Sequence, residues 1–360
     1  MKAAVCYEFG KPLVIEEVAI SPPEEGEVKV RLAATAVCHS DIHDIKGELP
    51  GPVPFVGGHE SAGYIEEVGS GVTSLKAGDH VMVSLMFSCG NCHYCTIGLP
   101  HLCMAKFAPP QHVRLKNKDG KPLAQRGSVG GFAEYVLVNA SQVVKVPDDM
   151  PLDRVALLSC GVITGFGAVV NRARVRPFES VVVMGTGGVG INTIQGAAYA
   201  GAYPIIAVDV LDTKMKMALD FGATHTVNAT RDDATDEVKK LTSGRGADYV
   251  FITVGSINAI KQGFGMSAPR GTTVVIGLPP ATEQLCISPL ELIPVERNLI
   301  GGFMGAVNIK VDIPNLVAMY QTKRLKLDEI ITGRYPLERI NEAIESTEKG
   351  EALRNVIMFE

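Results

Sequence analysis

The sequence predicts an α/β protein of two domains, one rich in β-strands and one built on a doubly wound parallel sheet. Its 360 residues exceed what one hydrophobic core usually supports. Up to about residue 155 the chain consists of short alternating segments separated by glycine, proline and aspartate, which is typical of β-strands. Beyond that point apolar β-branched runs alternate with helical patterns, which indicates a parallel sheet covered by helices on both faces.

The first half, residues 1–155, is expected to form the β-rich domain. Residues 1–18 read as a strand, a Gly-Lys-Pro turn and a second strand. Further strands are expected at residues 27–37, 61–69, 78–85, 130–139 and 142–147. Residues 104–131 are rich in proline and glycine, and we expect a surface excursion with at most a small hairpin.

The second domain is expected over residues 156–300. Buried parallel strands are predicted at residues 180–185, 204–210, 247–255 and 271–277, and helices at residues 191–201 and 211–222. Two amphipathic helices and a closing strand follow, at residues 312–325, 337–350 and 353–360. The pattern alone leaves open which domain residues 301–360 join.

The composition excludes several classes of function. A net charge of −5 without a lysine or arginine cluster argues against nucleic-acid binding. No signal peptide is recognisable, and no stretch approaches the roughly 18 consecutive apolar residues of a membrane span. We therefore expect a cytoplasmic protein that has no membrane partner, in a reducing compartment where closely spaced cysteines are metal ligands rather than disulfides.

A glycine-rich turn in the second domain predicts a dinucleotide site. Gly185, Gly187 and Gly190, with Gly188 and Val189 between them, form a G-x-G-x-x-G motif between a strand and a helix. Such glycines permit a tight turn, close approach of a pyrophosphate and strand–helix packing. Asp209 ends the next strand, where an acidic residue binds the ribose and repels the phosphate of NADP, so NAD is favoured. Lys214 could also reach the ribose, although a solvated helix lysine fits the sequence equally well, and the whole motif could be an ordinary glycine turn.

Four of the eight cysteines are close together in sequence. Cys89, Cys92, Cys95 and Cys103 have the spacing C-x2-C-x2-C-x7-C. Free or paired thiols are the alternative, but four thiolates close around one zinc ion in a tetrahedron. Because such a site leaves no open coordination position, we expect it to brace a loop rather than to react.

A second metal site is indicated by Cys38 and His59, which are suitable zinc ligands in turn-rich segments. The residues alone leave the third ligand open between Glu60 and Cys160. Taken singly, a cysteine is more often a small buried hydrophobe.

Several motifs in this order make the chain similar to the zinc-containing medium-chain alcohol dehydrogenases. They are "CHSDIH", "GHES" followed by "GVTSLKAGDHV", the four-cysteine lobe, "CGVITGFGA", "GTGGVG" and the terminal "LRNVIMF". The resemblance covers essentially the whole chain. It implies a GroES-like catalytic domain to which residues 301–360 return, a Rossmann NAD-binding domain, and two zinc ions per chain.

The resemblance also implies roles for single residues. Cys38, His59 and Cys160 would bind the catalytic zinc, Glu60 would approach it during ligand exchange, and Asp41 would orient the histidine, unless Asp41 is only a turn aspartate.

Further roles implied by the resemblance concern the proton, the cofactor and the substrate. Ser40 and His43 would carry the substrate proton to solvent while hydride passes to the nicotinamide, although His43 could be a surface histidine. His39 and Arg354 would face the cofactor pyrophosphate, and Val254 and Leu278 the nicotinamide. Leu49 and Leu85 would line the substrate pocket, or be plain core leucines.

The substrate and the oligomer remain expectations. Residues 104–131 resemble the extra segment of the dimeric branches, so we expect a homodimer through the Rossmann domain, with a tetramer possible. Primary or aromatic alcohols are favoured over the hydroxymethyl adduct of a small thiol, because the charged pocket groups of formaldehyde dehydrogenases have no clear counterpart. A non-catalytic NAD-binding protein and a zinc-ribbon nucleic-acid module are the competing functions.

Overall fold

The computed structural model describes residues 1–106, 113–231 and 233–360. The chain divides into two compact units, one formed by Met1–Cys160 and Asn308–Glu360, the other by Gly161–Val307. Both boundaries lie a few residues later than those expected from the sequence. The part of the 104–131 excursion at residues 107–112 lies outside the described residues.

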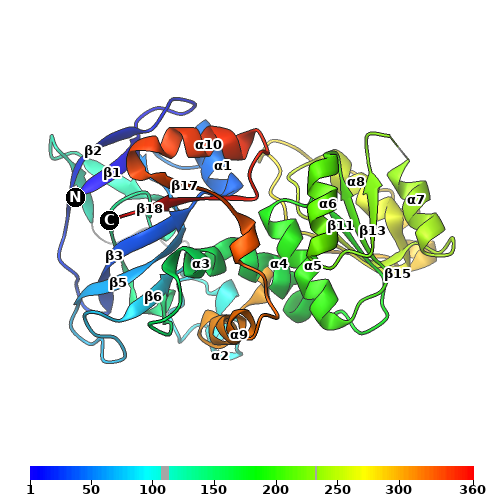
Figure 1. The fold of residues 1–360 in the computed structure, drawn as a ribbon, viewed down its shortest axis with the longest axis horizontal. Coiled ribbons are helices and arrows are strands. Elements are labelled where there is room, and N and C mark those ends of the chain that lie inside the picture. Colours follow the sequence, from blue (N-terminus) through cyan, green and yellow to red (C-terminus); the bar gives the residue numbers. More distant parts are fainter. Residues whose placement is uncertain (107–112, 232) are drawn as a thin grey trace. The chain divides into compact units, whose positions relative to one another are not determined.

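The first unit contains a small closed barrel and a seven-stranded sheet (Figure 1). The barrel has the order β1 (Lys2–Cys6), β2 (Val14–Ile20), β7 (Leu115–Asn117), β8 (Pro122–Gln125) and β4 (Phe55–Val56). The sheet has the order β10 (Val143–Lys145), β6 (His80–Val83), β5 (Glu60–Val68), β3 (Glu27–Ala36), β18 (Arg354–Met358) and β17 (Ile331–Pro336), with β9 (Tyr135–Asn139) also on β3. β7 and β8 form the small hairpin expected within the excursion.

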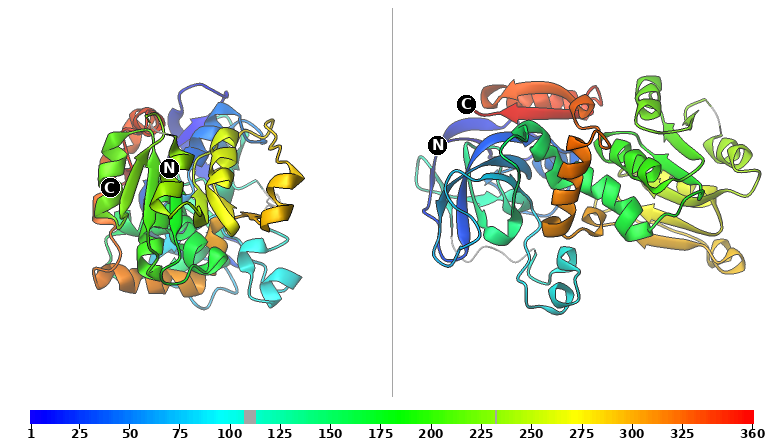
Figure 2. Two further views of the ribbon diagram at one scale, coloured as in Figure 1. Left: turned by 90° about the vertical axis from the view of Figure 1, so that its right-hand side faces the viewer. Right: turned by 60° about the horizontal axis from the view of Figure 1, so that its bottom comes forward.

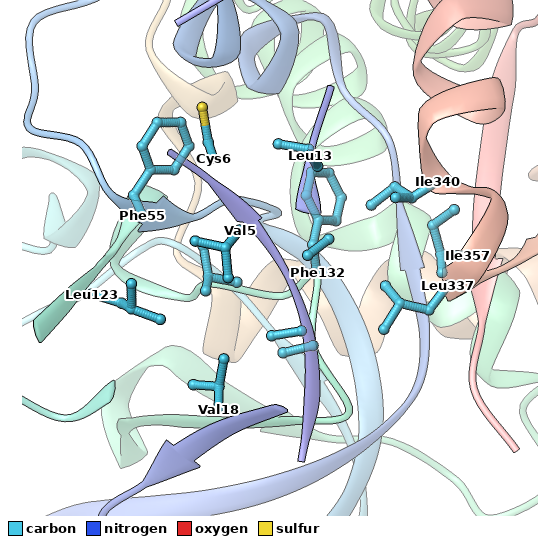
Figure 3. Packing of buried hydrophobic residues seen from close by; sticks show 14 of the residues in the cluster. Val5, Cys6, Leu13, Val18, Phe55, Leu123, Phe132, Leu337, Ile340 and Ile357 are labelled. Atoms are coloured by element: carbon cyan, nitrogen blue, oxygen red, sulfur yellow. The ribbon is translucent and has the colours of Figure 1, made fainter. Parts of the chain in front are cut away.

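The helices of this unit are α1 (His39–Lys46), α2 (His93–Thr96), α3 (Leu152–Leu157), α9 (Ile309–Gln321) and α10 (Ile340–Glu348). Helix α2 belongs to the four-cysteine lobe, drawn in cyan, which stands out from the body of the unit in Figure 2. The core under the barrel joins residues from both ends of the chain, because Phe55 and Phe132 lie in one buried cluster with Leu337, Ile340 and Ile357 (Figure 3).

The second unit is a six-stranded parallel sheet. Its order is β13 (His225–Asn228), β12 (Ile205–Asp209), β11 (Val181–Met184), β14 (Ala247–Ile252), β15 (Ser267–Val275) and β16 (Asn298–Gly301). Numbered along the chain this is the order 3-2-1-4-5-6 of a dinucleotide-binding fold. Its helices are α4 (Ile163–Gly167), α5 (Gly188–Ala200), α6 (Asp212–Asp220), α7 (Ala234–Leu241) and α8 (Ile257–Met266), and helices lie on both faces of the sheet (Figure 2). The predicted α/β class with a doubly wound sheet is confirmed.

One helical run departs from the sequence-based expectations. Leu152–Ala173 has the length and mean hydropathy, 1.5, of a membrane span, but 89% of its most apolar stretch is buried inside the protein, as in a core helix. The run includes wide π-helical turns at Leu158–Val162 and Ala168–Ala173. Such turns are often found at functional sites, and the first of them carries Cys160.

Candidate functional site

The N-terminus of α1 presents Cys38. This residue is the N-cap, and its extended backbone turns the chain from the end of β3 into the helix. The Cys38 N–H donates to Asp41 Oδ2 at 3.0 Å, so the aspartate side chain helps to close the first turn of the helix.

Asp41 connects this helix to His59. It is 2% exposed, and its Oδ1 accepts from Gly58 N–H at 3.1 Å and from His59 Nδ1 at 2.9 Å. Although burial lowers it, the charge of Asp41 and its hydrogen bond raise the pKa of His59 well above its ordinary value. With Nδ1 occupied, His59 Nε2 is buried without a hydrogen-bond partner in the described chain. A metal ion that displaced the proton from Nε2 would find there a buried lone pair without another partner, while Nδ1–H stays on Asp41.

Four potential metal ligands meet in this unit. The ligand atoms of Cys38, His59, Glu60 and Cys160 all lie within 4.8 Å of one another, and all four residues are buried. Zinc binds sulfur at about 2.3 Å and imidazole at about 2.0 Å, so ligands on one ion lie within such a separation. The residues present therefore fit a zinc ion.

The charges in the cluster also favour a bound cation. A hydrogen bond from Cys160, followed by the positive charge of Arg354, holds the pKa of Cys38 well below its ordinary value despite burial. The same hydrogen bond and burial raise the pKa of Cys160, and burial raises the pKa of Glu60 to about 8. The cluster thus favours the thiolate form of Cys38, whereas ionisation of Cys160 as well needs a positive ion in the cluster.

Glu60 has a partner that sequence reasoning missed. The Arg354 guanidinium lies 3.1 Å from Glu60 Oε1, and both side chains are buried. Among the two residues left open as third ligand, Glu60 is thus held by a cation of the protein itself, which favours Cys160. The expected pairing of Arg354 with a cofactor pyrophosphate stays a prediction.

Ser40 and His43 lie on α1, three residues apart and hence on one face of the helix. Ser40 Oγ lies 3.7 Å from Cys38 Sγ, which places the hydroxyl beside the ligand cluster. His43 Nδ1 forms a hydrogen bond with the carboxylate of Glu48, a residue that sequence reasoning did not single out. His39 is exposed at the start of the helix, and Leu49 and Leu85 are half-buried.

The four-cysteine lobe forms a second cluster. The ligand atoms of Cys89, Cys92, Cys95 and Cys103 lie within 4.8 Å of one another. The Cys89 N–H donates to Cys103 Sγ at 3.3 Å, and backbone hydrogen bonds lower the pKa of Cys92 to about 6. Four converging sulfurs fit a structural zinc ion with no open position.

The glycine-rich turn of the second unit has the geometry of a dinucleotide site. Gly185 has a φ of +86°, and a Cβ on Gly190 would lie 1.8 Å from the Gly185 carbonyl oxygen. Gly187, the N-cap of α5, has no atom within 4 Å of the position of a Cβ. The open space at a helix N-terminus fits a pyrophosphate.

Asp209 braces this turn, which the sequence did not reveal. Its Oδ2 accepts from Thr186 N–H at 2.7 Å and from the Thr186 hydroxyl at 2.8 Å, and its Oδ1 accepts from Val210 N–H at 2.8 Å. The carboxylate thus lies between the turn and the end of β12, while Lys214 is half-buried on α6.

Val254 and Leu278 follow β14 and β15 and are exposed. The two loops run close together, because a Cβ on Gly255 would lie 2.2 Å from the Leu278 carbonyl oxygen.

Comparisons with known proteins decide the family. Residues 24–148 match the alcohol dehydrogenase GroES-like domain, and residues 188–322 match the zinc-binding dehydrogenase domain. The chain is 40% identical over 365 residues to the NDMA-dependent alcohol dehydrogenase of Amycolatopsis methanolica, covering 99% of this chain and 98% of that protein. The chain belongs to the zinc-containing medium-chain alcohol dehydrogenase family.

Solved structures agree with the assignment. An alcohol dehydrogenase zinc-binding domain protein from Burkholderia ambifaria matches with a TM-score of 0.95 at 34% identity, covering 100% of this chain and 98% of that one. Benzyl alcohol dehydrogenase from Acinetobacter calcoaceticus matches with a TM-score of 0.93 at 31% identity, covering 100% of this chain and 99% of that one. The expected family, its two folds and its alcohol dehydrogenase class are confirmed, so this dehydrogenase is an oxidoreductase.

Proposed function

We propose that this dehydrogenase oxidises primary or aromatic alcohols reversibly, with NAD as hydride acceptor and zinc bound by Cys38, His59 and Cys160. The observation that carries the proposal is the buried His59 Nε2, which has no hydrogen-bond partner in the described chain and lies among two sulfurs and a carboxylate. A second zinc ion in the four-cysteine lobe would hold that loop.

The groups implied by this proposal supply the two difficult parts of the chemistry. Zinc supplies Lewis acidity that lowers the pKa of an alcohol oxygen, and NAD supplies the hydride acceptor. The protein's own residues do the rest. Asp41 holds the His59 ring, Ser40 takes the alcohol proton next to the Cys38 sulfur, and His43 passes it to solvent.

NAD is proposed rather than NADP because Asp209 ends β12 beside the glycine-rich turn, where its negative charge would repel a ribose phosphate. The name of the Amycolatopsis methanolica relative makes NDMA a second acceptor to test. The aromatic alcohol in the name of the Acinetobacter calcoaceticus structure supports the inclusion of benzyl alcohol.

The first experiment follows NADH formation by ultraviolet absorbance for the purified enzyme with a panel of alcohols. Parallel reactions contain NADP, NDMA, or formaldehyde with and without a free thiol. We expect NAD reduction with plain alcohols and its loss in Cys38→Ser. Activity only with the thiol adduct would move the enzyme to formaldehyde oxidation, and no activity in a fully zinc-loaded, NAD-binding protein would overturn the proposal.

We also propose that the enzyme is a homodimer through its second unit. Among the strands that the structure describes, β16 pairs with β15 alone and so lies at the edge of the sheet, and the segment before it exposes Leu290 (78%) and Ile293 (72%). An unpaired edge beside exposed apolar side chains is a typical interface. Sedimentation that shows only monomer would overturn this.

A cytoplasmic location, without membrane or nucleic-acid partners, is proposed as well, because none of the eight cysteines, all of which the structure describes, is in a disulfide. Cell fractionation tests it, and enzyme recovered only with membranes or secreted medium would contradict it.

A further inference from the structure

The C-terminus of α1 brings Glu48 back to His43. Gly47 ends the helix in the left-handed conformation with a φ of 75°, and its N–H donates to Asp44 O at 3.1 Å. The Glu48 N–H donates to His43 O at 2.9 Å. These two bonds form the helix-ending motif in which the second residue past the helix returns over its last turn.

The conformation depends on glycine. A Cβ on Gly47 would lie 2.8 Å from the ring of Phe9, in addition to the unfavourable φ. The position of Glu48 is therefore fixed by the backbone, not by a flexible loop.

The Glu48 carboxylate contacts the imidazole directly. Glu48 Oε2 and His43 Nδ1 are hydrogen-bond partners, with side-chain exposures of 35% and 27%. An ionised carboxylate only accepts hydrogen bonds, so Nδ1 carries the proton in this contact. The other ring nitrogen, Nε2, then has a free lone pair, and it makes no hydrogen bond to any residue that the structure describes.

The neighbouring charges have partners of their own. Lys46, on the same helix, pairs with Glu348 on α10, and Asp44 pairs with Arg126. Within the described ranges, Glu48 is thus the charged side chain that contacts the His43 ring.

We propose that Glu48 is a positioning residue for proton transfer in this dehydrogenase. It holds neutral His43 with the proton on Nδ1, so that Nε2 is the acceptor. When Nε2 takes the proton that originates on the alcohol, both ring nitrogens carry a proton, the carboxylate balances the charge, and the proton then passes from Nε2 to water. The inference rests on the proposed function, because it assumes that His43 carries the substrate proton.

The first test reads the tautomer in the resting protein without substrate. Nitrogen-15 NMR at alkaline pH is expected to show His43 protonated on Nδ1 in the wild type and in Glu48→Gln, whose amide oxygen can still accept. In Glu48→Val the ring should change to the tautomer with the proton on Nε2, which a histidine side chain without such a partner prefers. A wild-type ring protonated on Nε2, or a ring unaffected by Glu48→Val, would overturn the proposal.

The second test measures turnover. A positioned acid–base group contributes roughly 100- to 10,000-fold, so loss of its orientation in Glu48→Val should lower kcat about tenfold with KM nearly unchanged. Small buffer bases should restore part of the loss. Glu348→Gln removes a carboxylate that contacts the same helix at Lys46 without touching His43, and it should leave kcat unchanged.

The outcomes of the two tests distinguish failure of the proposed function from failure of the role proposed for Glu48. Wild-type enzyme without activity would overturn the proposed function, while the tautomer measurement still tests the contact. An active enzyme in which Glu48→Val changes the tautomer but not kcat would overturn the role of Glu48 in proton transfer. If Glu48→Val does not fold, the kcat of Glu48→Gln tests the role of Glu48 in proton transfer. This variant keeps the hydrogen bond to His43 Nδ1 and removes the negative charge that balances the doubly protonated ring.

Discussion

Replacement of Asp41 by asparagine tests whether this carboxylate holds His59 and the backbone of Cys38 in position at the metal site. The carboxylate has one oxygen for Cys38 N–H and the other for Gly58 N–H and His59 Nδ1, at 3.0, 3.1 and 2.9 Å. Asparagine offers one acceptor oxygen and one amide donor. If the oxygen stays on His59, the amide points at the Cys38 N–H and leaves that donor unsatisfied.

The expected loss of stability follows from the one backbone donor that asparagine leaves without an acceptor. A buried donor without a partner costs about 1–3 kcal/mol, so we expect Asp41→Asn to lower the unfolding free energy of the metal-free protein by about 2 kcal/mol. Because partners of metal-ligating histidines typically contribute about 10- to 100-fold in affinity, zinc binding at Cys38, His59 and Cys160 should weaken by this factor. Urea unfolding and zinc competition with a chromogenic chelator measure the two quantities.

Asp79 provides the matched control. It is 5% exposed and accepts from Lys76 N–H at 3.0 Å and from Lys145 Nζ at 2.6 Å, away from the metal cluster. Asp79→Asn should lower stability without changing zinc affinity. Equal zinc affinity in Asp41→Asn and the wild type would refute the reasoning that Asp41 positions His59.

The remaining predictions concern the glycine-rich turn, the stability of the protein at low pH, and the four-cysteine lobe. Gly190→Ala places a Cβ 1.8 Å from a carbonyl oxygen of its own turn and should lower both melting temperature and NAD affinity. Gly187→Ala, with no atom within 4 Å, should keep the melting temperature and lose only NAD affinity, as calorimetry can show. Although burial raises it, hydrogen bonds from Arg245 and from a serine lower the pKa of Asp248 to about 2. Because the unfolded value is about 3.9, Asp248→Asn should lower stability by about 1 kcal/mol near neutral pH, after allowance for solvent screening, and the difference should disappear as pH falls through about 2. A difference that persists below that pH would contradict the assignment. Cys95→Ser should remove one zinc equivalent by atomic absorption and leave the NAD affinity unchanged; loss of both ions would show that the two sites are coupled.

The sequence predicted what depends on local pattern. Apolar strands and the glycine-rich turn can be recognised from a few consecutive residues. The strands predicted from such runs, β11, β12, β14 and β15, form as expected. The helical run Leu152–Ala173 was not anticipated, because small and polar residues such as Ser159 and Thr164 interrupt its apolar pattern and its π-helical turns break the helical period.

Pairings across the sheet could not be predicted from local pattern. Ala36 on β3 is the register partner of Glu60 on one side and of Val356 on the other. This register brings Arg354, at the start of β18, beside Glu60. Such a contact follows from the order of strands in the sheet, which no motif near Arg354 encodes. The Glu48 contact with His43 is local, and the glycine two residues before Leu49 was the signal that could have revealed it.

The position of β18 has a consequence for how the chain matures. This strand lies between β3 and β17, and in sequence it follows the whole of the second unit, Gly161–Val307. During synthesis the second unit therefore has its whole sequence available before β18 is made, whereas until then the first unit lacks an inner strand and the partner of Glu60. We expect nascent chains that have not reached β18 to contain a folded second unit and an incomplete metal site, so that the proposed catalytic zinc is acquired only after β18 has been synthesised.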